Sequence, residues 1–190
     1  MLLIKKRRWL YCFSLIVALF GCGSTGIASS DNQDLAAAIR DIVDHGQLDD
    51  YKYVAQRLGI NITAGPLETL SDPETHYYRG NATEFFTDKS VTERFSVMPK
   101  DFRYRISRAS GSNKFRGMLS LDNMTSKGCI DQTKMFKVFG FSTPVPNPHA
   151  KIKSFRYFFK RGQDYELDII YETVDSNCAA TFYLFQNRTT

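Results

Sequence analysis

Residues 155–169 read FRYFFKRGQDYELDI, and this stretch decides the fold class because it predicts two antiparallel strands. Aromatic side chains stand at every second position from Phe155 to Phe159, and apolar side chains do so from Tyr165 to Ile169. Since neighbouring residues of a strand point to opposite faces, each strand has one face suited to a core. The Arg-Gly-Gln sequence between them is typical of a hairpin loop.

The pairing register of this hairpin follows from parity. Both apolar sets must lie on the same side of the sheet, which requires an odd number of loop residues unless a bulge intervenes. We therefore predict a three-residue loop at 161–163. The predicted cross-strand pairs, two apolar and two oppositely charged, are Phe159 with Tyr165, Tyr157 with Leu167, Lys160 with Asp164 and Arg156 with Asp168.

The rest of the chain predicts further strands and three helices. Strand character is expected from near Val91, most clearly at 102–106, then at 115–122 and from Cys178 to Phe185. Residues 64–90 lead to no assignment. Apolar spacing predicts helices over 34–45, 50–58 and 130–139, the first capped by Asp31 or Asn32. The predicted fold class is α+β, with an N-terminal helical hairpin and one further helix packed on antiparallel sheet.

The N-terminal segment is typical of an export signal. Four basic residues precede an apolar run from Trp9 to Phe20, which is too short to span a membrane as a helix. Leu19-Phe20-Gly21-Cys22 resembles the lipobox of bacterial lipoproteins, although that family prefers a small residue where Phe20 stands. The resemblance implies cleavage before Cys22, lipidation of that cysteine and, with Gly23 rather than Asp after it, an outer-membrane anchor facing the periplasm. Ordinary cleavage near 27–29, which would discard Cys22, is the alternative.

The expected domain organisation is a signal peptide at 1–21, a flexible tether at 22–30 and one α+β domain at 31–190. A repeated pattern of a helix ending in glycine also allows two helix-then-sheet units, 31–122 and 129–187. This pattern resembles exported bacterial modules of the β-lactamase-inhibitor-protein kind, which bind partner proteins on a sheet face. A capped helix followed by strands is nevertheless common in any α+β protein.

The cysteines predict one disulfide. Cys12 lies in the signal core and Cys22 at the lipobox-like site, which leaves Cys129 and Cys178 as a pair in an exported chain. A bond between them would close a loop of about 50 residues and stabilise the fold by about 4 kcal/mol on the loop-entropy model.

The chain has a net charge of +5 that is unevenly distributed along the sequence. The four basic residues of the signal account for most of it, because the remaining 21 basic residues face 20 acidic ones. This near-balance removes the main support for a nucleic-acid partner. Within the domain, residues 94–116 carry seven basic residues and one acid, whereas residues 31–50 carry six acids and one arginine.

The basic stretch supplies the candidate binding residues. Arg103 and Arg105 lie on the polar side of a predicted strand and Arg116 on its partner, so they predict a positive sheet surface for a partner protein with an acidic surface, lipid phosphates or peptidoglycan carboxylates. Two alternatives compete with this hypothesis: the acidic helices cover and neutralise these arginines, or the arginines form a solvated face.

No motif of catalysis accompanies these arginines. The chain has three histidines and lacks His-Glu-x-x-His, Gly-x-Ser-x-Gly and a phosphate-binding glycine loop, so we expect no enzyme, cofactor or metal site. The sequence favours an envelope protein that binds another protein as an inhibitor or immunity-type module. A periplasmic binder of a small ligand, lipid or envelope polymer is the alternative.

Overall fold

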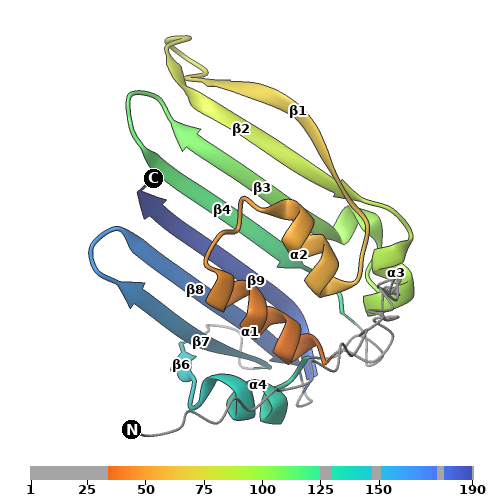
Figure 1. Ribbon diagram of the computed structural model, residues 1–190. Helices are drawn as coiled ribbons and strands as arrows, with labels where there is room; N and C mark the ends of the chain where they lie inside the picture. Colours follow the sequence, from red (N-terminus) through yellow and green to blue (C-terminus); the bar gives the residue numbers. More distant parts are fainter. Residues whose placement is uncertain (1–33, 125–129, 147–150, 175–177, 190) are drawn as a thin grey trace, which may run out of the picture.

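The computed structural model describes residues 34–124, 130–146, 151–174 and 178–189. These residues form one antiparallel sheet with helices, as the sequence predicts for an α+β protein (Figure 1). The helical elements are α1 (Leu35–His45), α2 (Tyr51–Leu58), α3 (Ser90–Phe95), a 3-10 turn (Pro99–Asp101) and α4 (Gln132–Phe139). The strands are β1 (Ile62–Ser71), β2 (Tyr78–Thr87), β3 (Phe102–Ala109), β4 (Lys114–Leu121), β5 (Ile130–Asp131), β6 (Thr143–Val145), β7 (Ile152–Arg161), β8 (Tyr165–Val174) and β9 (Cys178–Thr189).

The nine strands form a single sheet in the order β1-β2-β3-β4-β9-β8-β7-β6, and β5 adds a short pairing to β9. Each half is a meander of neighbouring antiparallel strands, and the two halves join where the last strand, β9, pairs with β4. The sequence allowed two helix-then-sheet units, 31–122 and 129–187. The described strands of both ranges belong to one continuous sheet, joined by the pairing of β4 with β9.

The helical hairpin α1–α2 covers one face of this sheet (Figure 1). Asp34 is the N-cap of α1, because its side chain accepts a hydrogen bond from Ala36 N at 3.1 Å, so the predicted cap at Asp31 or Asn32 is wrong. Glycines in the left-handed conformation end both helices, at Gly46 and Gly59. These two helices thus end where the sequence predicts. The expectation that strand character begins near Val91 is wrong, because Ser90–Phe95 form α3 and β3 begins at Phe102.

The core lies between this hairpin and the sheet. Alternate residues of the central strands are buried there. Examples are Tyr104, Leu119, Leu184 and Ile169, none of which is more than 2% exposed. Their partners on the helices and the connecting loop are Ile39, Ile42, Leu48, Val54 and Leu58. Burial of such aliphatic side chains is the main source of stability in a domain of this size.

The loop between α1 and α2 is fixed to the sheet by polar groups as well. Buried Gln186 of β9 accepts a hydrogen bond from Leu48 N at 2.9 Å and donates one to Gly46 O at 2.8 Å. Tyr104 donates its hydroxyl proton to the carbonyl of Leu48. Gly117 permits this close approach, since a Cβ there would lie 2.9 Å from Leu48 Cδ2.

The register of the β7–β8 hairpin differs from the prediction by two residues. Phe159 pairs with Leu167 and Lys160 with Glu166, so the loop consists of residues 162–164 rather than 161–163. The predicted apolar sides are correct, because a shift of two residues keeps every side chain on its face. All four predicted cross-strand pairs are therefore wrong: Tyr165 pairs with Arg161, Tyr157 with Ile169 and Arg156 with Ile170.

Two outer strands occupy the region that the sequence left unassigned. Strands β1 and β2 pair over 62–71 and 78–87, with a register shift between Ala64 and Leu67 at Gly65-Pro66. Proline lacks the N–H that an inner strand requires, and β1 accommodates it at the edge of the sheet. The opposite edge, β6, is three residues long and has Pro144 at its centre.

Candidate interaction surface

The sheet has a second face, opposite α1 and α2, that the described helices leave uncovered (Figure 1). Strand alternation places Arg103 and Arg105 of β3 on this face, since their neighbours Phe102, Tyr104 and Ile106 are buried on the other. On the adjoining central strands this helix-free face carries Arg116 and Met118 of β4, Tyr183 and Phe185 of β9, and Glu166 and Asp168 of β8.

The helix-free face is rich in aromatic side chains that remain open to solvent. Phe86 of β2 is 55% exposed and Phe158 of β7 is 50% exposed. Between them, the rings of Tyr183 and Phe185 stack with centroids 6.0 Å apart. Half-exposed aromatic groups on an uncovered sheet are typical of surfaces that bind other proteins.

All three predicted arginines lie on the helix-free face, but their charges are balanced to different degrees. Arg105 is held between two glutamates, with Nη1 3.0 Å from Glu84 Oε1 and Nη2 3.7 Å from Glu68 Oε2. Its positive charge is therefore largely compensated within the sheet. The alternation of the sequence places the residue, but β1 and β2, which bring the glutamates, were not predicted.

Arg103 and Arg116 are the more available cations. The side chain of Arg103 is 67% exposed and reaches Asp122 only at 3.9 Å. Arg116 is exposed and donates from Nε to the neutral amide oxygen of Asn187 at 3.2 Å. These two arginines, rather than Arg105, are suited to meet an acidic partner.

The acidic N-terminal segment does not cover these arginines, because its helices pack on the opposite face. Asp49 of the α1–α2 loop instead binds Arg188 at 2.7 Å and lies 3.6 Å from Arg108. Other acids of the segment pair locally, as Asp44 does with Arg40 at 2.8 Å. The alternative in which the acidic helices neutralise Arg103 and Arg105 therefore disagrees with the structure.

The helix-free face is not uniformly positive. Arg156 Nη2 donates to Asp168 Oδ2 at 2.7 Å, and Lys160 lies 3.2 Å from Glu166. Acidic side chains on β8 thus form ion pairs with basic side chains on β7. The surface is a mixed one in which exposed positive charge is concentrated on β3 and β4.

Two titratable groups at one end of this face, Asp122 and Tyr183, have raised pKa values because they are partly buried. Burial raises the pKa of the Asp122 carboxyl, and the nearby Arg103 guanidinium opposes this rise. Burial also raises the pKa of the Tyr183 hydroxyl, and the carboxylates of Asp122 and Glu172 raise it further. Oδ1 of Asp122 is buried and has no hydrogen-bond partner among the described residues.

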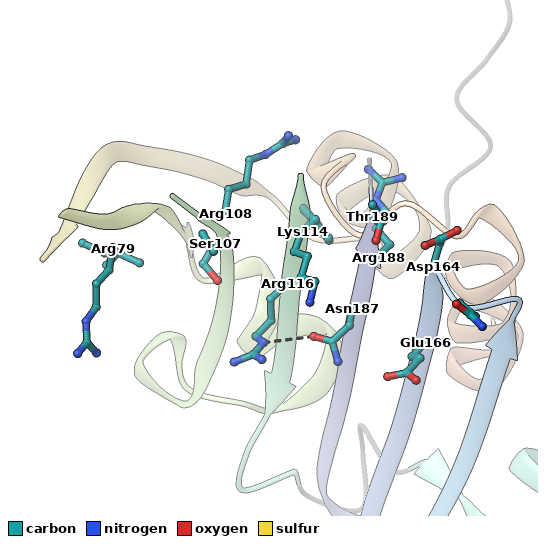
Figure 2. A pocket seen from close by; sticks show the side chains of 14 residues that line it. Arg79, Ser107, Arg108, Lys114, Arg116, Asp164, Glu166, Asn187, Arg188 and Thr189 are labelled. Atoms are coloured by element: carbon teal, nitrogen blue, oxygen red, sulfur yellow. Dashed lines mark hydrogen bonds between the residues drawn. The ribbon is translucent and has the colours of Figure 1, made fainter. Parts of the chain in front are cut away.

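A hollow of about 470 Å³ lies where the β3–β4 hairpin, the C-terminal end of β9 and the β7–β8 loop meet (Figure 2). Its basic lining residues are Arg79, Arg108, Lys114, Arg116 and Arg188, and its acidic ones are Asp164 and Glu166. Figure 2 shows Arg79, Arg116 and Glu166 pointing to the same side of the sheet and Arg108 to the other. The sequence identified part of this site through its basic stretch, but not the contribution of Asn187 and Asp164.

Gly80 follows Arg79, one of the residues that line the hollow. It pairs with Ala109, and its φ of 140° lies in a region that favours glycine. A Cβ at this position would lie 2.0 Å from the carbonyl oxygen of Arg108. The close approach brings the start of β2, with Arg79, against the end of β3.

The remaining predicted site residues are cysteines. Cys178 is disulfide-bonded, and its partner lies outside the described residues, as do Cys22 and Cys129. Asp131, two residues after Cys129 in the sequence, pairs with Cys178 across β5 and β9. The bond between Cys129 and Cys178 and the lipidation of Cys22 stay predictions.

Among the described residues no group of three or more His, Cys, Asp or Glu side chains is placed to hold a metal ion. Within the ranges that the structure describes, no helix has the length and apolar character needed to cross a membrane.

Comparisons of the chain with models of protein families, with curated proteins and with solved structures found no match.

Proposed function

We propose that the protein is an exported, membrane-tethered protein of the bacterial cell envelope that binds a partner protein through the helix-free face. The observation that carries this proposal is the set of aromatic side chains, Phe86, Phe158, Tyr183 and Phe185, on a sheet face that the described helices leave uncovered. Aromatic side chains with arginine at their margin supply most of the binding energy in many protein interfaces.

The expected partner presents acidic groups next to apolar ones. Arg103 is the exposed cation beside the aromatic surface, and Arg116 adds a second positive charge on the neighbouring strand. Complementary charges mainly raise the rate of association and the selectivity for one partner. The resemblance of the helix-then-sheet pattern to inhibitor modules of the β-lactamase-inhibitor-protein kind supports the same mode of binding.

Site-specific photocrosslinking tests this proposal. A photoreactive phenylalanine analogue at Phe158 should give one discrete adduct in envelope preparations, because this side chain is half exposed on the helix-free face. The control is the same analogue at Phe141, which is 90% exposed but lies in the connection between α4 and β6. Equal adducts from both positions, or none from Phe158, would contradict the proposal.

Charge reversal at Arg103 provides a second test with a matched control. Arg103→Glu should weaken the Phe158 adduct and leave the free energy of unfolding within about 0.5 kcal/mol, because exposed charges contribute little to folding. Lys153→Glu reverses an exposed charge on β7, on the same alternate positions as buried Tyr157, and should leave the adduct unchanged. Reversal at Arg105 is a poor test, because a third carboxylate would face Glu68 and Glu84.

The membrane tether is tested separately, because it rests on residues 1–30 of the sequence. The wild-type protein should partition with membranes, and Cys22→Ser should release it or leave the signal unprocessed. Wild-type protein that is fully processed and found in the soluble fraction would exclude lipidation.

A further inference from the structure

We propose that the hollow at the strand ends binds a ligand through a single phosphate group, held by Lys114 and Arg116. This hollow lies beside the aromatic surface of the proposed protein interface and shares Arg116 with it. The hollow has a volume of about 470 Å³, which is within the range of small-ligand sites. Its lining contains five basic residues against two acidic ones.

Not all of these basic residues are available to a ligand. Arg79 is paired with Asp72, and Arg108 and Arg188 both lie against Asp49. Lys114 and Arg116 have no ion pair with any residue that the structure describes. Two uncompensated positive charges match a phosphomonoester, which carries a charge of about −1.5 to −2 at neutral pH.

The geometry of Arg116 suits a phosphate. Its Nε donates to Asn187 Oδ1 at 3.2 Å, which orients the guanidinium while the bond uses only one of its donors. The planar guanidinium matches phosphate oxygens in a two-point contact, and Lys114 adds a second charge from the same strand. Ser107, the cross-strand partner of Arg116, also lines the hollow and offers a hydroxyl group.

The opposite wall restricts the ligand to one phosphate. Asp164 and Glu166 line the hollow from the β7–β8 side (Figure 2). Glu166 is balanced by Lys160 at 3.2 Å, but Asp164 has no ion pair within the described part of the chain. A second phosphate would approach these carboxylates, so the site favours a phosphomonoester or phosphodiester whose remainder is neutral or cationic.

Calorimetric titration of the purified protein with glycerol 3-phosphate tests this site. Wild-type protein should bind saturably at low salt, and Lys114→Gln combined with Arg116→Gln should weaken binding by about tenfold or more, as expected for the loss of charge-assisted hydrogen bonds. Both residues are exposed on β4, so the double variant should unfold at the same temperature as wild type. Arg103→Gln removes a cation from the same face but outside the hollow, and should leave the affinity unchanged.

Two further probes identify the source and the chemistry of the group. Vesicles of phosphatidylglycerol that bind wild type but not the double variant would assign the phosphate to a lipid headgroup, with phosphatidylcholine vesicles as the comparison. Binding of glycerol 3-phosphate without vesicle binding would assign it to a soluble ester.

The proposal is overturned if wild type binds neither probe saturably up to about 10 mM, if the folded double variant binds as wild type does, or if acetate competes as well as phosphate. Because the crosslinking test uses Phe158 and Arg103, failure of one proposal leaves the other standing.

Discussion

The two faces of the sheet use similar amino acids for different purposes, and β9 shows the contrast within one strand. Phe182, Leu184 and Gln186 point toward the helical hairpin and are at most 1% exposed. Tyr183 and Phe185, which alternate with them, lie on the helix-free face and remain partly exposed. Aromatic character therefore does not reveal which face of this sheet is covered. The position of the helices decides it.

The largest expected difference between the faces is the cost of removing an apolar side chain. Leu184→Ala should lower the free energy of unfolding by about 2 to 5 kcal/mol, because it leaves a cavity in the core. Phe158→Ala should cost about 1 kcal/mol, because half of its side chain is already in water. Urea unfolding of the two variants measures the difference. Equal costs would mean that the helix-free face is also buried, for instance in an oligomer.

A second, smaller difference is expected between two neighbouring polar side chains of β9, one on each face of the sheet. Gln186→Leu should cost about 2 to 4 kcal/mol, because the buried N–H of Leu48 and carbonyl of Gly46 would both lose their partner. Asn187→Leu, one residue further along the strand, should cost less than about 1 kcal/mol since Asn187 is exposed. Thermal and urea unfolding can be compared. If both substitutions cost the same, Gln186 does not fix the α1–α2 loop to the sheet.

Within the helix-free face, the two arginines of β3 should differ by a smaller amount. Arg105→Gln should lower the free energy of unfolding by about 1 kcal/mol, because it leaves Glu68 and Glu84 facing each other. Arg103→Gln should change it by no more than about 0.5 kcal/mol. The difference should shrink in high salt, where exposed charges are screened. A larger loss at Arg103 than at Arg105 would contradict the assigned ion pairs.

The smallest expected effect is that of Asp122, because Arg103 offsets part of its burial. Its raised pKa means that the ionised carboxylate opposes folding at neutral pH. Asp122→Asn should therefore be more stable than wild type at pH 7. This advantage should disappear as the pH falls through the raised pKa and below the ordinary value of 3.8, where the wild-type carboxyl is also neutral. A variant that is less stable than wild type at pH 7 would show that the charge is stabilising.

These contrasts also explain which parts of the fold could be predicted from the sequence. Apolar and polar residues alternate in the strand at 102–106, and apolar residues recur at every second position in both strands of the hairpin at 155–169. The faces of these strands were therefore predicted correctly, including the placement of Arg103 and Arg105. The β7–β8 register was wrong by two residues because alternation fixes parity, whereas turn geometry fixes the pairing. Arg156 still contacts Asp168, since residues diagonal to one another across two strands remain within reach of long side chains.

The candidate site could be predicted only in part, for a related reason. The sequence identified the basic stretch at 94–116, but the partners that compensate it come from distant segments. Glu68 and Glu84 lie on β1 and β2, where Gly65-Pro66 interrupts the alternation by which a strand is recognised. Asn187 and Asp164 reach the hollow because β9 pairs with both β4 and β8, a pairing that local patterns do not contain.

The prolines at the two edges of the sheet have a consequence for the protein at high concentration. A wide sheet with an aromatic face is at risk of joining to other copies, strand to strand, and growing into fibres. Pro66 in β1 and Pro144 in β6 each remove a backbone donor from an outermost strand, and β6 offers only three residues for pairing. Strand pairing between copies is thereby disfavoured at both edges of the sheet, a condition under which an aromatic face can stay accessible at a lower risk of aggregation.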